Sequence, residues 1–382
     1  MEGAKVLIIQ KSLPHYRLTF FEGLRRFLLT KGVELSLAYG NGNKEDQKKQ
    51  DLVKLDWAIP YENEVFSVAG KELYWQPLLH LVADFDLVVV EQANKLLLNY
   101  MLMVRKKKNG FKLAFWGHGI AENIGVSKTS KLWKQRLFHQ ADWWFAYTRG
   151  VADLLSRFGI DSSIITVVQN AIDTKKLQAD FEAGSQEELD LIKETYNIKG
   201  NCLGIYCGGI YEEKRSAFLL DAVIAVREQI ADFEFIVVGA GCEDFYWKNA
   251  ALAYPFIHYL GPQFGAQKAA LLKLSDVFLC PGLVGLAVLD AFVTQCPLIT
   301  TDYRYHSPEV DYLEHGYNGL ITDNTLDDYV QEVVALLEDE QRLNEMKTAC
   351  AISAAKYSIE HMVDNFGKGI LSALQPTLNT VS

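Results

Sequence analysis

The segment CPGLVGLAVLDAF, residues 280–292, has the residue types of a phosphate site. It reads as the end of a buried strand, a glycine-containing turn and the start of a helix. Gly285 leads into that helix, whose first N–H groups near Leu286 can hold a phosphate because they point out of the positive end of the helix dipole. Asp290 follows about one helical turn later, where its carboxylate can accept hydrogen bonds from a ribose diol.

A second phosphate candidate is CGGIYEEKR, which follows an apolar run. Gly208 and Gly209 relax the backbone, and Lys214 and Arg215 lie at the expected start of a helix. Two cations beside a helix N-terminus favour a diphosphate, because the dipole and the side chains attract the same charge. A Glu-Glu-Lys-Arg run is also typical of a solvated turn, so both interpretations stay open.

The segment HSPEVDYL predicts a further helix start. Ser307 is expected as the N-cap, Pro308 as the first helical residue and Glu309 in the first turn. Capping alone explains these three residues. His306 has no capping role, which makes it a candidate for ligand contact.

The first half of the chain offers different chemistry. The apolar run KVLIIQ, residues 5–10, is followed by KSLPHYRLTFFE, without the glycines that a dinucleotide pyrophosphate needs at such a turn. This counts against NAD or FAD here. His15, Tyr16 and Arg17 are bulky or cationic and fit a pocket that recognises a ligand through side chains. A loop in which the His and Tyr merely pack is the alternative.

Polar residues follow two more predicted strands of this half. Glu91 and Asn94 come after DLVVV, where a carboxylate is well placed to recognise a hydroxyl group; a helix-capping role for Asn94 is the alternative. His118 lies between two glycines in FWGHG, so its imidazole is expected to be exposed at a ligand site. Trp116 is expected in the core.

The elements that must position these residues follow a βα alternation. Near-continuous apolar runs predict parallel strands covered by helices on both faces. The polar segment 173–200 interrupts the pattern, which then restarts. Strands are expected at 5–10, 33–40, 85–92, 111–119, 141–148 and 163–173, then at 202–209, 233–241, 256–261, 276–282, 297–302 and 319–323, with helices including 18–32, 216–229, 265–274 and 286–294.

This alternation predicts an α/β fold of two doubly wound, Rossmann-like domains facing across a cleft. We expect the N-terminal domain over residues 1–172 and the C-terminal domain over residues 173–359. The last helix, about 360–382, comes after the second sheet is complete and is expected to return to the N-terminal domain.

Composition limits the class of protein. The 382 residues are 49% hydrophobic and 23% charged, which is typical of a globular protein. Residues 1–165 contain 23 Lys and Arg against 17 Asp and Glu, yet the whole chain has a net charge of -10, so the second part is strongly acidic. With this acidic balance and no recognised motif, a nucleic-acid binder is disfavoured. The six cysteines form no C-x-x-C pair and indicate free thiols in a reducing compartment.

Membrane contact is expected to be peripheral at most. No stretch approaches the roughly 18 apolar residues that span a bilayer, and the N-terminal apolar run is too short for a signal peptide. Basic residues at 105–108 and 128–136 favour contact with an anionic membrane surface. A cytoplasmic location, at or near the inner face of the cell membrane, is expected.

The chain resembles the retaining glycosyltransferases of family 4, which have the GT-B architecture. The matching segments, in order along the chain, are SLPHYRLTFFEGL, GHG, QNAIDT, GGIYEEKR, VVGAG, YLGP, PGLVGLAVLDAF and HSPEVDYLEHGYNGL. The resemblance covers nearly the whole chain. It implies transfer of a sugar from a nucleotide-diphospho-sugar with retention, without a metal or other cofactor. The C-terminal domain would bind this donor and the N-terminal domain a glycan or lipid-linked acceptor, in cell-surface polysaccharide, lipopolysaccharide or glycolipid synthesis.

The residues and the resemblance together define an expected site. His118 and Lys214 are expected to be catalytic, and Asp290 to bind the ribose. The other expected contacts are Gly208, Gly209, Lys214, Arg215, Gly285 and Leu286 for the diphosphate; Gly282, His306 and Glu309 for the donor sugar; and His15, Tyr16, Arg17, Glu91 and Asn94 for the acceptor.

The chain departs from the family pattern at three of these positions. Gly282 stands where the family has a sugar-contacting Glu, Gly209 where it has a phosphate-binding Arg, and Asp290 where it has a longer Glu. Lys214 and the helix N-terminus remain to stabilise a departing diphosphate, so a working enzyme is expected. The alternative is a catalytically weakened GT-B protein that binds a nucleotide or glycan. An oxidoreductase is disfavoured because the glycine fingerprint is missing.

Overall fold

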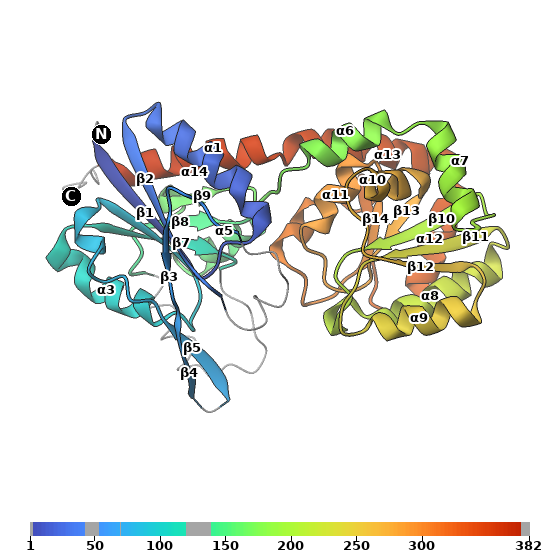
Figure 1. The fold of residues 1–382 in the computed structure, drawn as a ribbon, viewed down its shortest axis with the longest axis horizontal. Helices are drawn as coiled ribbons and strands as arrows, with labels where there is room; N and C mark the ends of the chain where they lie inside the picture. The colour runs from blue at the N-terminus through green and yellow to red at the C-terminus, as the bar shows by residue number, and fades with distance from the viewer. Residues whose placement is uncertain (1–2, 43–52, 69, 120–138, 376–382) are drawn as a thin grey trace. The chain divides into compact units, whose positions relative to one another are not determined.

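The computed structural model describes residues 3–42, 53–68, 70–119 and 139–375. The chain divides into two compact units, Met1–Ile172 with Ile359–Ser382, and Asp173–Ser358. Each unit contains one parallel sheet with helices packed against it (Figure 1). The basic segment at 128–136 lies outside the described residues.

The first unit has a parallel sheet of seven strands in the order β3-β2-β1-β6-β7-β8-β9. Its central strands are apolar along their whole length because both faces are covered, so that Val6 to Ile9 of β1 are almost fully buried. The strands are β1 (Ala4–Gln10), β2 (Val33–Gly40), β3 (Ile59–Tyr61), β6 (Leu87–Glu91), β7 (Lys112–Gly117), β8 (Trp143–Ala146) and β9 (Ile165–Val167); the helices are α1 (Leu18–Leu29), α3 (Leu97–Asn109), α5 (Arg149–Arg157) and α14 (Ile359–Leu374), with short 3-10 turns η1 (His15–Arg17), η2 (Val82–Asp84) and η3 (Ser162–Ile164).

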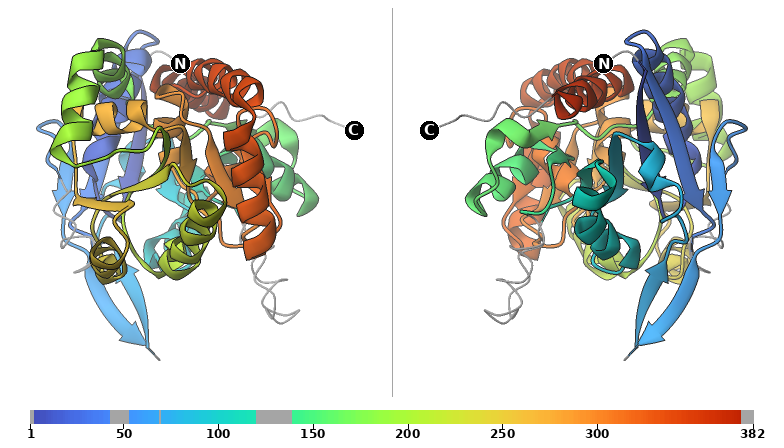
Figure 2. Two further views of the ribbon diagram at one scale, coloured as in Figure 1. Left: turned by 90° about the vertical axis from the view of Figure 1, so that its right-hand side faces the viewer. Right: turned by 90° about the vertical axis from the view of Figure 1, so that its left-hand side faces the viewer.

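An antiparallel hairpin of β4 (Glu64–Val68) and β5 (Lys71–Trp75) extends from this unit (Figures 1 and 2). Its base is held by Tyr74, which is fully buried and whose N–H donates to the Lys95 carbonyl. The outer part exposes Val65 and Phe66.

The second unit has a parallel sheet of six strands in the order β12-β11-β10-β13-β14-β15. The polar segment that interrupts the sequence pattern forms two helices, the second of which begins with a capping box at Ser185 and Glu188. The strands are β10 (Cys202–Cys207), β11 (Phe233–Val238), β12 (Ile257–Gly261), β13 (Val277–Leu279), β14 (Leu298–Thr301) and β15 (Gly319–Thr322); the helices are α6 (Lys175–Ala183), α7 (Gln186–Thr195), α8 (Ser216–Gln229), α9 (Asp244–Ala253), α10 (Gly265–Leu274), α11 (Ala287–Val293), α12 (Leu326–Glu338) and α13 (Glu340–Lys356), with 3-10 turns η4 (Glu212–Lys214) and η5 (Pro308–Tyr312).

Helix α14 completes the core of the first unit, as expected from its place after the second sheet. Its Phe366 stacks on Phe145 of β8, with ring centroids 4.1 Å apart and planes at 1°. Phe366 also packs edge-on against Phe20 and Trp116. Gly367 lets the helix approach α1 closely, since a Cβ there would lie 2.3 Å from the Phe27 ring.

All six cysteines are free, as predicted. Four of them, including Cys207 and Cys280, are buried, and burial raises the pKa of both these thiols. Cys242 is exposed, unlike the others.

Candidate functional site

Lys214 joins the two predicted phosphate segments of the second unit. It ends turn η4 after β10, is only 7% exposed, and its Nζ donates to the Leu283 carbonyl in the loop before α11. The Leu283 N–H in turn donates to the Glu213 carbonyl at 2.8 Å. The turn after Gly208 and Gly209 and the loop before Gly285 are therefore held together, with an ammonium group between them.

The start of α11 follows this loop directly. Leu286 is its N-cap, and Val288 and Leu289 donate to the carbonyls of Gly285 and Leu286. The helix therefore begins where the sequence predicts, with the Gly285–Leu286 backbone at its N-terminus. A role for this backbone in holding a phosphate stays a prediction.

Gly282 has no room for a side chain. A Cβ at this position would lie 2.3 Å from the carbonyl oxygen of Glu213 and 2.6 Å from the carbonyl carbon of Lys214. The space that a side chain would need is filled by backbone, and contact of Gly282 itself with the donor sugar stays a prediction. Glycine is required here because the Lys214 turn packs directly against it.

Arg215 is fixed by the chain itself. Its Nη1 donates to the Pro281 carbonyl at 3.1 Å, to Thr301 Oγ1 at 3.1 Å and to Asn324 Oδ1 at 2.7 Å. Its guanidinium also lies 4.1 Å from the centre of the Phe218 ring. Burial lowers its pKa, but an arginine keeps its charge. Arg215 therefore ties the ends of β13, β14 and β15, and its contact with a diphosphate stays a prediction.

His306 has a structural role that the sequence did not indicate. Its Nδ1 accepts from the Val284 N–H at 3.0 Å, and its Nε2 bonds the Thr301 carbonyl at 2.8 Å. Because one partner is a donor and the other an acceptor, the ring must be the neutral tautomer with its proton on Nε2. Burial lowers the pKa of His306, in keeping with that form. Both ring nitrogens have partners within the chain, and contact of His306 with the donor sugar stays a prediction.

The next residues form η5, which begins as predicted with Ser307 at the N-cap and Pro308 at the first position. It is a 3-10 turn, and Ser307 caps it without a side-chain hydrogen bond. The Ser307 N–H donates to the Val284 carbonyl at 3.0 Å, which places η5 against the loop before α11. Glu309 is 3% exposed, so its carboxyl group is buried at the start of this turn.

Asp290 of α11 has a partner that sequence reasoning missed. Lys268 of α10 donates to its carboxylate, and both side chains are largely buried. Lys268 lies among small and apolar residues of α10 (GAQKAALLKL), so no signal in the sequence marks it. The expected ribose carboxylate is thus half of an ion pair.

In the first unit, Arg17 belongs to the core. It is 4% exposed, its Nη1 donates to Asn170 Oδ1 at 2.8 Å, and its guanidinium lies 4.8 Å from the Trp116 ring centre. Its charge therefore has partners inside the unit, and contact of Arg17 with the acceptor stays a prediction. His15 and Tyr16, in the same turn η1, are exposed.

A cavity of about 220 Å³ lies at the carboxyl ends of β1, β6 and β7. It brings Glu91 and His118 together, as the strand ends predict. Glu91 accepts a hydrogen bond from the Lys11 N–H, and burial raises the pKa of its carboxyl group although the Lys11 N–H and neighbouring cations oppose this. His118 is exposed, with its ring centre 4.4 Å from that of Tyr147. The remaining lining residues are Lys11, Gln92, Ala93, Lys95, Leu96, Trp116, Gly117 and Tyr147.

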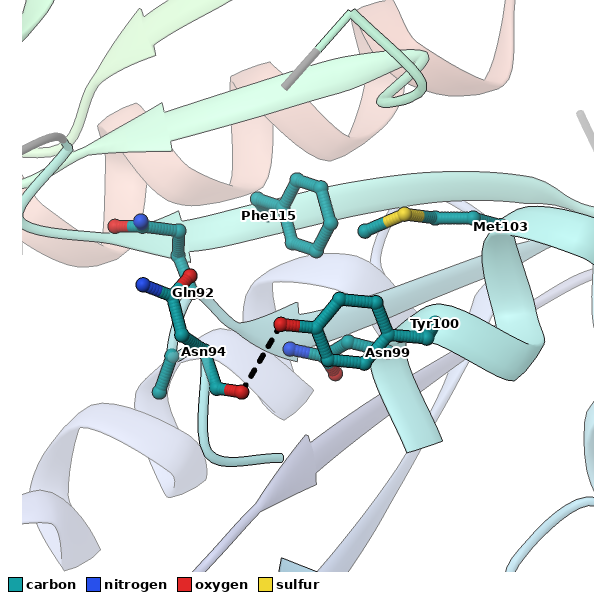
Figure 3. Close-up of a pocket in the computed structure, with 7 residues that line it drawn as sticks. Gln92, Asn94, Asn99, Tyr100, Met103 and Phe115 are labelled. Carbon is teal, nitrogen blue, oxygen red and sulfur yellow. Dashed lines mark hydrogen bonds between the residues drawn. The ribbon is translucent and has the colours of Figure 1, made fainter. Parts of the chain in front are cut away.

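Asn94 lies beside this cavity, in a smaller pocket shown in Figure 3. Its carbonyl accepts from the Tyr100 hydroxyl at 3.0 Å. Helix α3 is capped by Leu96, so Asn94 is not the helix cap considered as an alternative. Two lysines of the larger cavity, Lys11 and Lys95, were missed because they follow strands of ordinary composition.

Within the part of the chain that the structure describes, no group of three or more His, Cys, Asp or Glu side chains is placed to hold a metal ion. No described helix is both long and apolar enough to cross a bilayer.

Sequence comparison assigns both units to known families. Residues 19–176 match the profile of Glycosyltransferase Family 4, and residues 202–339 match that of Glycosyl transferases group 1. The chain is a GT4-like glycosyltransferase. A phosphatidyl-myo-inositol mannosyltransferase of Mycobacterium leprae is 30% identical over 100 residues, which are 25% of this chain and 27% of that protein. The matched stretch thus spans about a quarter of that relative.

Solved structures show that this GT4-like glycosyltransferase has the GT-B fold. Anabaena Alr3699/HepE in complex with UDP matches 96% of this chain and 100% of its own, with a TM-score of 0.68 and 14% identity. A glycosyltransferase from Rickettsia africae gives the same TM-score and identity over 97% of this chain and 99% of its own. The lipopolysaccharide outer core galactosyltransferase WaaB matches 96% of this chain and 99% of its own, with a TM-score of 0.62 and 15% identity.

Proposed function

We propose that this GT4-like glycosyltransferase moves a sugar from a nucleotide-diphospho-sugar to a glycan or lipid-linked acceptor, with retention of configuration and without a metal ion. The observation that carries the proposal is the hydrogen bond from the buried Lys214 to the Leu283 carbonyl, because it holds a cation at the loop that leads into α11. The UDP and UDP-glucose complexes of Alr3699/HepE, which has the same fold, support a nucleotide-sugar donor.

In this proposal the donor diphosphate lies against Gly208, Gly209 and the start of α11. The bond between the sugar and the diphosphate breaks, and Lys214 and the Gly285–Leu286 backbone stabilise the negative charge that develops on the leaving oxygens. The acceptor hydroxyl approaches from the face on which the diphosphate leaves, and a phosphate oxygen takes its proton. The configuration is therefore retained without a protein nucleophile.

His118 stabilises the sugar at the reacting centre, and Asp290 accepts hydrogen bonds from the ribose. Asp290 remains suited to that role beside Lys268, since a carboxylate has acceptor sites for more than one donor. The Lys268 ammonium also fixes the orientation of the carboxylate before a ligand binds.

The acceptor binds in the first unit, at the cavity that Glu91 and His118 line and beside the exposed His15 and Tyr16.

We place the enzyme at the inner face of the cell membrane, in the synthesis of a cell-surface polysaccharide, lipopolysaccharide or glycolipid. The supporting observation is the end of α3, where Val104 is 78% exposed next to the exposed Arg105, Lys107 and Lys108. Flotation with anionic vesicles that is lost at high salt tests this contact; flotation with neutral vesicles or none at all would contradict it.

The donor is tested by a thermal-shift screen of UDP-, GDP- and ADP-sugars. A true donor at about 100 times its Kd should stabilise the protein by about 2.7 kcal/mol. Magnesium and a chelator are compared in the turnover assay, and the product anomer is read by NMR. Dependence on the metal or an inverted anomer would refute those parts of the proposal.

A second candidate is a GT-B protein that binds a nucleotide or glycan without turnover. The observation in its favour is that Lys214, Arg215 and Asp290 all have protein partners already. Binding of a nucleotide-sugar without release of nucleotide diphosphate, across a panel of acceptors, would favour this candidate over the enzyme.

A further inference from the structure

Two lysines of the acceptor-side cavity share one aromatic ring. Lys11 follows β1 and Lys95 follows β6, and both line the cavity. Their Nζ atoms lie 5.5 Å and 5.4 Å from the ring centre of Tyr74 in β5. Tyr74 is fully buried, so this ring is a fixed support that restrains both ammonium groups through cation–π attraction.

The charge of the cavity wall is positive. Glu91 is the only carboxylate among the described lining residues, against two lysines. One of its oxygens already accepts from the Lys11 N–H. Burial raises the pKa of the Glu91 carboxyl group, while the Lys11 N–H and the charges of Lys11 and Lys95 lower it. The Glu72 carboxylate accepts from the Tyr74 hydroxyl and is not among the lining residues, so the described lining itself has two cations against one carboxylate.

The size of the cavity limits what can bind. Its volume of about 220 Å³ corresponds to roughly seven water molecules at about 30 Å³ each. This suits one sugar or polyol ring with a small charged substituent. The rings of His118 and Tyr147 on the wall provide flat faces against which such a ring can pack.

We infer that this cavity binds an acceptor whose sugar or polyol has an anionic group, a carboxylate or a phosphate, and that Lys11 and Lys95 bind this group. The inference rests on the proposed function and narrows its acceptor class. Lysine suits either anion, because it acts as a point charge with three donors and demands no planar partner. The hairpin contributes through Tyr74, which holds the two lysines in place.

Calorimetric titration of the full chain tests the inference. The probes are methyl β-glucoside, methyl β-glucuronide and glucose 6-phosphate, which separate the neutral ring, the carboxylate and the phosphate. We expect at least one charged sugar to bind about tenfold or more tightly than the neutral one, and its affinity to fall with added salt. Equal binding of all three probes, or binding of neither charged sugar, would overturn the inference.

Variants then locate the contact. K11M/K95M should lose about tenfold or more in affinity for the charged sugar but not for the glucoside, and K11R/K95R should keep most of it. The single variant K95M, which changes an exposed side chain, gives the same readout if the double variant does not fold. K54M removes another exposed charge of the first unit and serves as the control; an equal loss in K54M would overturn the assignment.

Nucleotide titrations distinguish a failure of the anion subsite from a failure of the proposed donor chemistry. UDP, GDP and ADP are titrated into the same preparations. Binding of a nucleotide without discrimination between charged and neutral sugars would reject the anion subsite alone. Binding of a charged sugar with no response to any nucleotide would instead reject the proposed donor chemistry.

Discussion

The ammonium group of Lys268 lies 2.7 Å from a carboxylate oxygen of Asp290, and the two side chains are 24% and 16% exposed. The pKa of Lys268 is raised overall. Burial lowers this pKa, but the charge and hydrogen bond of Asp290, together with Cys207, have the larger combined effect. The pair links α10 to α11 next to Cys207, at the end of β10. The carboxylate expected to bind the ribose is therefore anchored on a second helix.

K268M should destabilise the protein by about 1–3 kcal/mol, because the Asp290 carboxylate would lose its buried partner. It should also weaken nucleotide binding, since the carboxylate would no longer be held in one orientation. Urea denaturation and calorimetry measure the two effects. K248M is the matched control: it breaks a pair with Asp244 whose lysine is exposed, and it should change stability little. Equal effects in both variants would contradict the importance of the Lys268 pair.

G282A should destabilise the loop before α11, because the added Cβ would meet the Glu213 carbonyl oxygen at 2.3 Å. Overpacking of this kind costs about 1–3 kcal/mol. G285A, three residues later, is the control, since its nearest neighbour would be Ser307 Oγ at 3.7 Å. G282E, which installs the family's carboxylate, should therefore impair nucleotide binding. Improved binding in G282E would show that the loop rearranges.

The second unit should become less stable as the pH decreases, because His306 is then protonated. Burial lowers the folded-state pKa of His306 below its ordinary value of 6.5; Lys214 and Arg215 reinforce the shift, while the Thr301 hydrogen bond and Asp302 oppose it. The neutral ring therefore stabilises the fold above about pH 6.5, and this contribution is lost as the pH falls from that value to the lower folded pKa. Urea midpoints of wild type and H306Q across this window measure the effect.

H306Q should show a flatter pH dependence, because glutamine does not protonate in this range. H80Q, which removes an exposed histidine of the first unit, should leave the wild-type slope unchanged. An H306Q slope equal to that of wild type would assign the titration to another group.

K214A should lower the rate of sugar transfer by about 10²–10³-fold, the usual effect of removing one group that stabilises a leaving oxyanion. Nucleotide release in the presence of acceptor is the measurement. K176A is the control, because Lys176 is 82% exposed and pairs with Asp180 on its own helix. A K214A enzyme as active as wild type would remove Lys214 from the mechanism.

F366A should destabilise the first unit by about 3–5 kcal/mol, since it removes a ring packed among three other aromatic side chains. I352A on α13 changes a side chain that is 59% exposed and should cost little. Hydrogen exchange would show whether the protection lost in F366A is that of α1 and the strands of the first sheet. Loss confined to α14 would mean that the helix only covers an already complete core.

Most strands and helices of both sheets could be predicted because the hydrophobic pattern of each is local, but the short edge strand β3 was missed. The bounds of α8 and α10 and of β2 match the sequence expectation, since each begins or ends at a clear change of hydrophobic period. The β4–β5 hairpin was missed, because a two-stranded ribbon without a fully buried face leaves no strong alternation.

The site could be predicted only as far as strand ends place residue types at one edge of a sheet. Glu91 and His118 meet at one cavity for that reason. The roles of Arg17 and His306 could not be foreseen, because Asn170 and Thr301 satisfy them from other parts of the chain. The type of a residue shows which hydrogen bonds its side chain can form, but the partner that forms them is known only from the fold.

The contact between Phe366 and Phe145 also sets an order of events during synthesis. The ribosome makes the first sheet, then the whole of the second unit, and only then the helix that covers Phe20, Trp116 and Phe145. Until α14 emerges, the nascent first unit exposes an aromatic surface that its own later sequence must cover. The second unit, whose strands and helices are contiguous in the chain, can finish folding before the first.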